Sequence, residues 1–370
     1  MKNYIDLKKT YKLEEIDKNS EDTYLAEDID YSKIRFEIKA AEDIIDYSDG
    51  SYYYKKDETV GIYEIGDDGT LTVENLPMGK FFVKEISTLE GYVLDEETYM
   101  VEFIQTDTTT KVYEYTLNLE NLMTTIEISK VNIKDKLIEG CTLELYKECY
   151  NENGESYFEL VDSWTTNDET HIVKGLSVNS KCILKEIQVA ENYVLAKDIE
   201  FTVKNSDYQN VKMIDKQVSI TKVNVEGEKV EGAYLQVIDR NGKIIDEWVS
   251  SSKTSHYVSN LKEGEKFTLV ELCAPKGYVK AKSTEFIVTY DKRTQEIVLI
   301  DKIVEMSKKD INGNELEGAT MIVTHTKTKN IVDKWISGKE PHRINNLIEG
   351  ERLYTSRRDS SKWICKSYRY

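Results

Sequence analysis

The sequence predicts an all-β protein built from tandem antiparallel β-sandwich modules in a row. Short segments in which Val, Ile, Thr, Tyr and Leu alternate with polar residues are typical of strands with one buried face. Asn-Gly, Glu-Gly and Lys-Gly pairs separate these segments about every ten residues, as turns do in sandwiches. The same order of strand segments and turn pairs recurs along the chain with a period of about ninety residues. No segment has the pattern of a long amphipathic helix.

Four landmarks define the repeat. A strand opens three of the copies at Ile126, Val218 and Val304. A Glu-Gly pair then starts a second strand, and a Trp and a His follow farther on. These landmarks are Glu139, Glu231 and Glu317; Trp164, Trp248 and Trp335; and His171, His256 and His342. Because the Trp and His residues of different copies cannot form one cluster, we expect them to serve in packing or turns.

The landmarks divide the 370 residues into four repeats. The first repeat, residues 1–123, is divergent and carries an insertion at 41–70. The second repeat covers 124–216 and the third covers 217–302. The fourth, 303–370, begins with the pattern, but after Thr355 a basic, unpatterned segment replaces the expected strand with its Glu and Gly-Tyr. We expect the fourth repeat to be truncated or frameshifted, which resequencing of the gene would decide.

Composition and charge exclude several classes of function. A net charge of −18 opposes binding to nucleic acid, because phosphate contacts need an excess of Lys and Arg. No apolar run is long enough for membrane insertion of this chain. The 5 Cys residues form no CxxC pair and no catalytic motif occurs, so we expect no metal, no cofactor and no enzyme. The first residues lack the pattern of a signal peptide, and no LPxTG sorting motif is present.

Charged residues continue the core-facing side of several predicted strands. Side chains two positions apart on a strand share a face, so Lys130 lies on the face of Ile126 and Ile128. Glu186 and Asp215 continue apolar faces in the same way. The equivalent residues elsewhere are Lys222, Glu271 and Asp301 in the third repeat, Lys308 in the fourth and Glu85 in the first.

Each complete repeat therefore aims a Lys, a Glu and an Asp into its core. Unpaired buried charges cost several kcal/mol, so the three groups must satisfy one another or react. One interpretation is a buried salt-bridge triad. The other is an isopeptide bond, in which desolvation neutralises the amine and the carboxyl, the Lys attacks the Asp, and the Glu transfers protons as water leaves. The residues alone leave both interpretations open.

Three motifs carry these residues: an opening Ser/Thr-Lys-Val-Asn, the run Leu-Val-Glu-Leu-Cys-Ala-Pro-Lys-Gly-Tyr at 269–278, and a closing Val-Leu-Ile-Asp-Lys. Together they resemble the Cna B-type, or SpaA-like, repeats of Gram-positive pilins and surface adhesins of the MSCRAMM type. The resemblance implies a prealbumin-like, Ig-like sandwich in which a Lys of the first strand bonds to an Asn or Asp of the last, assisted by the Glu. The matching residues are Lys130, Glu186 and Asp215 in the second repeat, and Lys222, Glu271 and Asp301 in the third.

Two repeats depart from the family pattern at the reacting positions. In the first repeat the position that matches the Lys is Glu15, although Glu85 and a candidate acceptor, Asn121, remain. We therefore expect no bond in the first repeat. The fourth repeat keeps Lys308 but lacks the Glu. In the second repeat Asn192 replaces the turn Gly, which Asn can do because it tolerates the left-handed conformation.

The resemblance predicts an extracellular structural or adhesive protein of the cell wall or cell surface. Its candidate partners are other surface-protein or pilin subunits and a host extracellular protein or glycan. One alternative is a spacer stalk for an enzymatic or ligand-binding head that this chain lacks. Another is that the first repeat itself binds a host protein or glycan through Tyr52, Tyr53 and Tyr54. Exposure of these rings as one patch favours that alternative, and burial opposes it.

Overall fold

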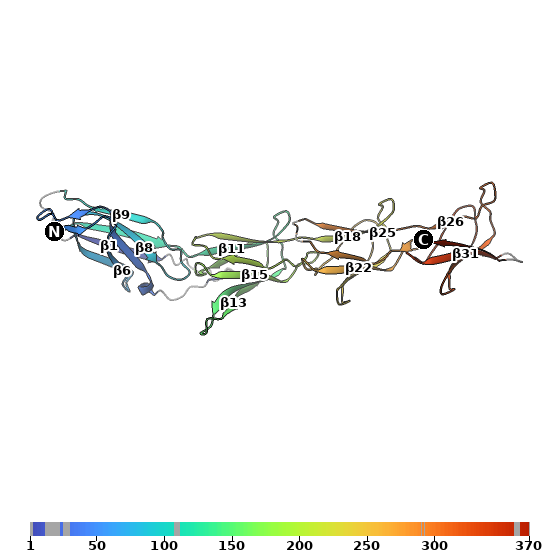
Figure 1. The fold of residues 1–370 in the computed structure, drawn as a ribbon, viewed down its shortest axis with the longest axis horizontal. Coiled ribbons are helices and arrows are strands. Elements are labelled where there is room, and N and C mark those ends of the chain that lie inside the picture. Colours follow the sequence, from blue (N-terminus) through green and yellow to red (C-terminus); the bar gives the residue numbers. More distant parts are fainter. Residues whose placement is uncertain are drawn as a thin grey trace. The chain divides into compact units, whose positions relative to one another are not determined.

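Strands make up nearly all of the regular structure. The computed structural model describes residues 3–11, 23–24, 30–106, 112–289, 291, 293–358 and 363–369. The one helix among them is the 3-10 helix η1 (Tyr31–Lys33) (Figure 1). The predicted all-β fold is therefore confirmed. Among these residues, none of the helical structure is long and apolar enough to cross a membrane.

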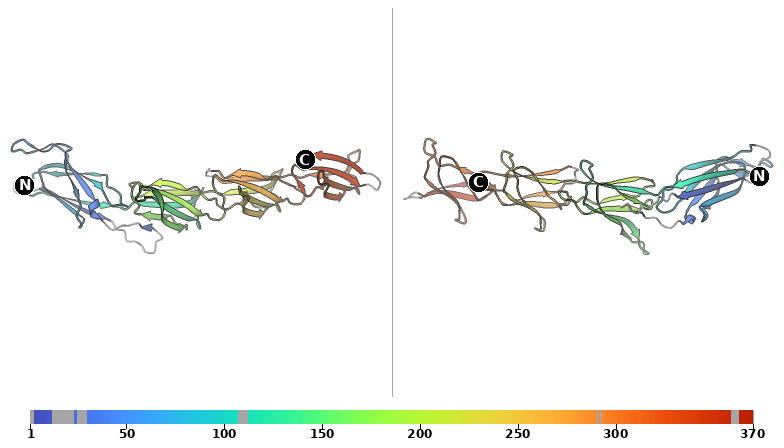
Figure 2. Two further views of the ribbon diagram at one scale, coloured as in Figure 1. Left: turned by 60° about the horizontal axis from the view of Figure 1, so that its bottom comes forward. Right: turned by 180° about the vertical axis from the view of Figure 1, so that it is seen from behind.

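The chain forms two compact units. Unit 1 comprises Met1–Lys130, Leu143–Lys185 and Asp198–Met213, and unit 2 comprises Val131–Thr142, Glu186–Lys197 and Ile214–Tyr370. Within each repeat the strands are grouped into facing layers (Figure 2).

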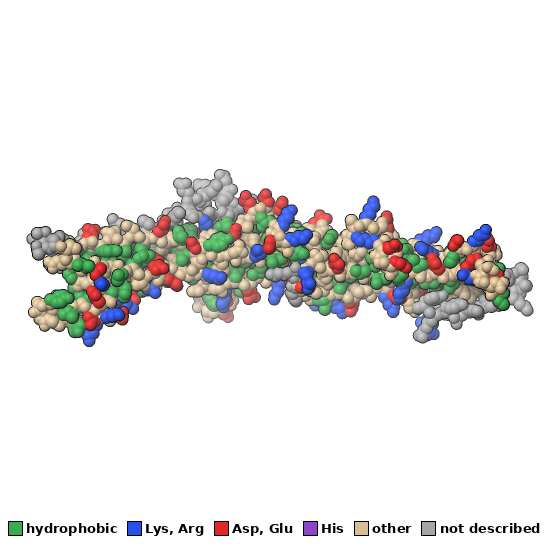
Figure 3. All heavy atoms as spheres, turned by 90° about the horizontal axis from the view of Figure 1, so that it is seen from above, with side chains coloured by type: hydrophobic (Ala, Val, Ile, Leu, Met, Phe, Trp, Pro, Cys, Tyr) green, Lys and Arg blue, Asp and Glu red, His purple; other side chains and the backbone are tan. Residues whose placement is uncertain are grey.

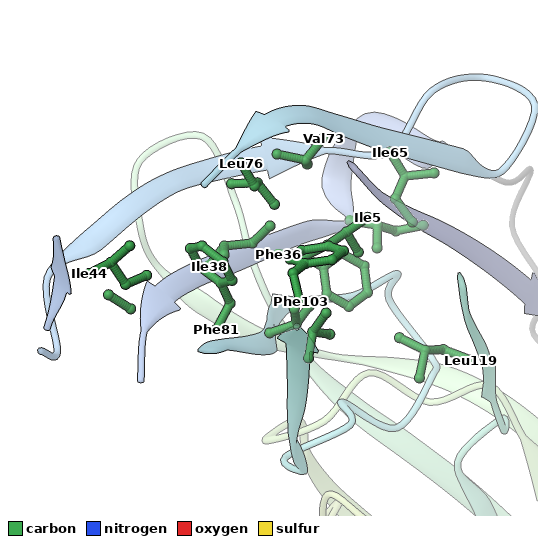
Figure 4. Close-up of a cluster of buried hydrophobic side chains, with 14 of the residues drawn as sticks. Ile5, Phe36, Ile38, Ile44, Ile65, Val73, Leu76, Phe81, Phe103 and Leu119 are labelled. Carbon is green, nitrogen blue, oxygen red and sulfur yellow. The ribbon is translucent and has the colours of Figure 1, made fainter. Parts of the chain in front are cut away.

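Two sheets enclose the core of the first repeat, one in the order β10-β1-β7 and the other in the order β6-β3-β8-β9. Their strands are β1 (Asn3–Tyr11), β3 (Arg35–Ala40), β6 (Thr59–Glu64), β7 (Thr70–Leu76), β8 (Gly79–Ser87), β9 (Thr98–Phe103) and β10 (Glu114–Asn121). Strand β1 runs parallel to β10 and antiparallel to β7. Alternate residues such as Phe36 and Ile38 on β3, and Phe81 and Val83 on β8, are fully buried between the sheets with Ile5 (Figure 4).

Only part of the expected insertion at 41–70 is additional to the sandwich. Residues Thr59–Glu64 form β6, the edge strand that pairs with β3. The added piece is the short hairpin of β4 (Ile44–Ile45) and β5 (Tyr52–Tyr54). The buried side chain of Ile44 packs into the core, so it anchors the hairpin to the sandwich.

The second repeat also has two sheets, in the orders β17-β11-β14-β2 and β13-β12-β15-β16. Their strands are β2 (Thr23–Tyr24), β11 (Thr125–Asn132), β12 (Thr142–Tyr150), β13 (Ser156–Thr165), β14 (His171–Lys174), β15 (Lys181–Gln188), β16 (Ile199–Thr202) and β17 (Gln209–Asp215). Strand β14 runs antiparallel to β11 and parallel to β2, a strand supplied by residues that precede the first sandwich's β3.

The third repeat has the sheets β21-β18-β25 and β20-β19-β22-β24. Their strands are β18 (Val218–Asn224), β19 (Tyr234–Asp239), β20 (Ile244–Val249), β21 (His256–Tyr257), β22 (Lys266–Cys273), β24 (Thr284–Ile287) and β25 (Gln295–Asp301). Strands β18 and β25, the first and last of the repeat, are parallel neighbours. Leu235, Val237, Val258, Leu261 and Leu269 are fully buried between the two sheets.

The fourth repeat contains the sheets β26-β29 and β28-β27-β31-β32, and β23 pairs with β30. These strands are β23 (Val279–Lys280), β26 (Glu305–Met306), β27 (Thr320–His325), β28 (Ile331–Ile336), β29 (His342–Arg343), β30 (Leu347–Ile348), β31 (Arg352–Arg358) and β32 (Trp363–Arg369). The expectation that the basic tail lacks regular structure is therefore wrong, because β31 continues to Arg358 and pairs with both β27 and β32.

The recurring Trp and His residues pack against each other inside each repeat. The ring centroids lie 4.0 Å apart for Trp164 and His171 and 4.1 Å apart for Trp248 and His256, and the rings are nearly parallel. The fourth repeat has the same stack at 4.3 Å. Each Trp lies on an edge strand of one sheet and each His on a strand of the other, so the stack links the two sheets. The predicted packing role is confirmed.

An Asp completes each of these stacks. The Nε2 atom of His171 lies 2.6 Å from Asp162 Oδ2, and the corresponding distances are 2.8 Å in the third repeat and 3.0 Å in the fourth. The three carboxylates belong to Asp162, Asp246 and Asp333.

On the surface, acidic and basic side chains are mixed rather than separated (Figure 3).

Candidate functional site

Lys222 and Asp301 meet between the first and last strands of the third repeat. In the parallel register of β18 and β25, Lys222 is opposite Leu299 and Asn224 is opposite Asp301. The Lys222 Nζ atom donates a hydrogen bond to Asp301 Oδ1. Both side chains are 0% exposed. The parity prediction, which placed both residues on the core face, is therefore correct in its geometry.

Glu271 reaches this pair from the facing sheet. It lies on β22, and its Oε1 atom is 3.3 Å from Lys222 Nζ. Its other carboxylate oxygen accepts a hydrogen bond from the backbone N–H of Ala281 at 2.6 Å. The Glu271 side chain is also 0% exposed. An amine, its carboxyl partner and a second carboxylate thus share one pocket without water access.

Burial changes the protonation of the acceptor. Removal from water raises the pKa of Asp301 to about 7; the nearby Lys222 limits the rise and the Glu271 charge adds to it. A carboxyl group with this pKa is partly protonated near neutral pH. Neutral amine and neutral carboxyl are the forms that condense to an amide.

The second repeat buries the same three residue types. Lys130, Glu186 and Asp215 are 2%, 5% and 1% exposed, respectively. Glu186 Oε2 accepts the backbone N–H of Ala196 at 2.7 Å, as Glu271 accepts that of Ala281. Lys130 lies on β11, the strand next to the β17 strand that carries Asp215. The predicted residues therefore occupy equivalent positions in the two repeats.

A thiol joins the acids of the second repeat. The Cys141 Sγ atom and carboxylate oxygens of Glu186 and Asp215 all lie within 4.8 Å of one another. This is the one group in the described part of the chain with three side chains close enough to hold a metal ion. The sequence alone does not reveal this cluster, because Cys141 and Asp215 are 74 positions apart. Its two carboxylates are those that the sequence predicts to act on Lys130.

In the first repeat Glu85 and Asn121 are together in the core, 1% and 2% exposed. The Asn121 Nδ2 atom donates to Glu85 Oε1 at 3.2 Å and to Thr88 Oγ1 at 2.5 Å. Glu85 Oε2 accepts the backbone N–H of Asp95 at 2.9 Å, which repeats the contact made by the other two glutamates. The carboxamide oxygen of Asn121 is buried and has no hydrogen-bond partner among the described residues.

The strand register corrects the sequence alignment of the first repeat. Glu15 lies outside the described residues, and the strand that pairs with β10 is β1. Asn121 is opposite Tyr11, so the position two residues earlier is Lys9. The alignment with Glu15 is therefore wrong. The alternation of Ile5, Leu7 and Lys9 was the signal in the sequence, and it matches the alternation that ends in Lys222.

The fourth repeat has only part of the site. Lys308 is half-buried beyond the short strand β26. On β31, Arg357 is opposite Met321 of β27. The equivalent pair in the third repeat is Glu271 opposite Leu235. A basic residue thus stands where the other repeats have their glutamate. Whether a frameshift produced it stays a prediction.

Family comparisons agree with this geometry. The model of the SpaA prealbumin-like fold domain matches the chain three times, at residues 32–116, 124–217 and 216–303. The chain belongs to this family. The predicted SpaA-like family and prealbumin-like sandwich fold are both confirmed. No curated protein matches the chain.

Several solved structures are similar to the chain at low identity. The Bacillus anthracis TIE protein is 21% identical over 81% of this chain and 51% of that protein, with a TM-score of 0.29. A streptococcal ancillary pilin is 16% identical, covering 82% and 99%, with a TM-score of 0.30. BcpA, the major pilin of Bacillus cereus, is 14% identical, covering 82% and 100%, with a TM-score of 0.25. The chain spans about half the length of the first of these.

Proposed function

We propose that the chain is a structural and adhesive protein of the cell surface whose SpaA-like repeats are closed by autocatalytic isopeptide bonds. The observation that carries the proposal is the buried trio of Lys222, Glu271 and Asp301, in which the amine already contacts the carboxyl. Lys130, Asp215 and Glu186 are the corresponding residues of the second repeat. Other surface-protein or pilin subunits are the proposed partners.

The reaction joins Lys222 Nζ to the carboxyl carbon of Asp301. A proton passes from the ammonium to the carboxyl, and the amine then attacks the carbon. The Oε1 atom of Glu271 is close enough to accept the remaining proton from the nitrogen and return it to the departing hydroxyl. One N–C bond forms, one C–O bond breaks and one water leaves. The reaction occurs once per repeat, so the chain turns over no substrate.

The bond would suit a chain that carries tension. It ties the first strand of the repeat to the last, and the two residues are 79 positions apart. Closing a loop of this length stabilises a fold by about 4.5 kcal/mol on the loop-entropy scale used for disulfides. Reducing agents do not cleave an amide, so the link would persist in any redox environment.

The intact mass of the purified chain tests the proposal. We expect a deficit of one water for each Lys–Asp bond, removed by Lys130→Ala in the second repeat and by Lys222→Ala in the third. The exposed Lys134 and Lys229 lie on the same repeats, so Lys134→Ala and Lys229→Ala are matched controls that should keep the deficit. A wild-type mass equal to the plain sequence would show that the trios are only buried ion pairs.

A second candidate function is supported by the β4–β5 hairpin. Tyr47, Tyr52 and Tyr53 are 97%, 53% and 50% exposed, whereas Tyr54 packs against the core. The Tyr53 hydroxyl donates to Asp46 Oδ2 at 2.6 Å, which fixes one ring on the hairpin. Exposed aromatic rings on an anchored hairpin are typical of a surface that binds a protein or glycan.

Binding to immobilised matrix proteins and glycans tests the second candidate. We expect the double variant Tyr47→Ser/Tyr52→Ser to lose binding that the wild type shows. The variant Ile62→Ser alters an exposed apolar residue of β6 outside the hairpin and should keep it. Equal binding by all three proteins would refute a role for the hairpin.

A further inference from the structure

In the second and third repeats, the loop that follows the glutamate strand enters the core of the next repeat. In unit 2, Val194 comes from the loop after β15 of the second repeat, is 1% exposed, and packs in the core of the third repeat. Val279 comes from the loop after β22 of the third repeat. It is 7% exposed and packs with Val323, Ile344 and Leu347 of the fourth repeat.

Backbone pairing reinforces this second anchor. Strand β23, which contains Val279, runs parallel to β30 of the fourth repeat. The Gly277 N–H donates to Asn345 Oδ1 at 3.0 Å, and the Glu349 N–H donates to the Lys280 carbonyl at 3.1 Å. The loop between the third repeat's β22 and β24 is thus held from outside its own sandwich.

The same loop positions the glutamate of its own repeat. Ala281 is two residues beyond Val279, and its N–H donates to Glu271 Oε2 at 2.6 Å. Ala196 is two residues beyond Val194, and its N–H donates to Glu186 at 2.7 Å. The anchor and the donor are therefore separated by a single residue in both repeats.

Unit 1 shows the same arrangement in the first repeat. The Asp95 N–H donates to Glu85 at 2.9 Å. Upstream in that loop, the Gly91 carbonyl accepts the N–H of Thr124, the residue with which the second repeat begins, at 2.9 Å. A Cβ at Gly91 would come within 2.5 Å of the Gly175 carbonyl oxygen, so the loop lies directly against the second repeat.

We propose that each repeat's isopeptide reaction depends on the folding of the repeat that follows it. The inference rests on the proposed function. Docking into the next core fixes the loop, the fixed loop presents its N–H, and that N–H orients the glutamate carboxylate toward the Lys amine. A loop without its anchor samples other conformations, and the glutamate then loses the donor that aims it. Val279 and Val194 are positioning residues in this scheme.

Refolding of full chain that has not yet reacted, isolated from inclusion bodies in denaturant, tests the coupling, because an amide that has already closed survives unfolding. The two amides are followed over time by peptide mass mapping. We expect Val279→Ser to slow closure of the Lys222–Asp301 amide about tenfold, the rate equivalent of one lost hydrogen bond. The Lys130–Asp215 amide should close at the wild-type rate and serves as an internal measure of folding. Val279→Ile should restore the rate, and Lys276→Ala, exposed on the same loop, should leave it unchanged.

A second pair of variants tests the donor itself. Ala281→Pro removes the N–H that Glu271 accepts, and we expect it to slow the same amide, whereas Ala281→Gly keeps the N–H and the rate. Equal rates in the wild type and Val279→Ser would overturn the coupling alone. Absence of both amides from the wild-type chain would instead contradict the proposed function, and the coupling with it.

Discussion

Lys9 holds the same place relative to Asn121 that Lys222 holds relative to Asp301: each Lys is two residues before the one that faces the acceptor on a parallel strand. The first repeat thus has the register, the buried glutamate and an acceptor in its last strand. An Asn acceptor changes the leaving group from water to ammonia.

We predict a third bond between Lys9 and Asn121. The intact chain should have lost two waters and one ammonia, and Lys9→Ala should restore only the mass of the ammonia. Lys8 is the matched control, because it is opposite Asn118 and has the other parity on β1. A loss confined to two waters in the wild type would contradict this third bond.

We predict that Lys222→Met lowers the local stability of the third repeat. Loss of the cross-link removes about 4.5 kcal/mol on the loop-entropy scale. Hydrogen exchange of peptides from β18 and β25 measures the opening free energy there, independently of the other repeats. Lys229→Ala should leave exchange unchanged, and protection that survives in Lys222→Met would show that the amide adds little.

We predict that closure of the Lys222–Asp301 amide slows below neutral pH. Burial raises the pKa of Asp301 to about 7, so below that pH the carboxyl binds a proton from solvent instead of the one from Lys222. The pair must then release one proton before the amine can attack, and the fraction that has released it falls about tenfold for each pH unit below that pKa. Amide formation in unreacted chain, refolded at a series of pH values, should follow this decline. A rate that stays level from pH 7 to pH 5 would argue against the neutral-pair mechanism.

We predict that Asp333→Ala destabilises the fourth repeat by about 1 to 3 kcal/mol at pH 7, because it removes charge-assisted hydrogen bonds. Burial alone raises the pKa of Asp333, but the Asn345 N–H and His342 outweigh it and hold the pKa below its usual value. A lowered carboxyl pKa gives stability that is present above the unfolded-state value and lost as pH falls through the folded one.

The measurement is hydrogen exchange of β28 and β29 peptides at neutral and strongly acidic pH. The variant and the wild type should differ at neutral pH and converge in acid. Glu340→Ala, an exposed acidic position of the same repeat, is the control. A difference that persists in acid would assign the effect to lost packing rather than to the carboxylate charge.

Strand alternation allowed most of the site to be predicted. A side chain's face depends only on its parity along the strand, so the burial of Lys130, Lys222 and Asp301 could be predicted without the fold. Lys9 was missed because the first repeat was aligned on the Ser/Thr-Lys-Val-Asn motif and not on the alternation of apolar and polar residues along the strand. The Asp of each Trp–His stack also had a signal, since Asp-x-Trp recurs in Asp162, Asp246 and Asp333.

The docking of Val194 and Val279 could not be predicted in this way. Strand β23 has two residues, too few for any periodicity, and Val279 contributes to a core outside its own sandwich. The turn chemistry at Gly277, with a φ of 86°, indicates a bend but not what the bend contacts. Contacts between repeats depend on surfaces that only the folded sandwiches create.

The parallel pairing of β18 and β25 bears on how far a repeat can lengthen. If the third repeat were unlinked and pulled open, the 79 positions between Lys222 and Asp301 could extend to roughly 270 Å. With the amide closed, none of that contour length is released, because force passes from one strand directly to its neighbour. A linked repeat would therefore keep its length under tension, whereas an unlinked repeat would unfold, lengthen and dissipate the applied energy.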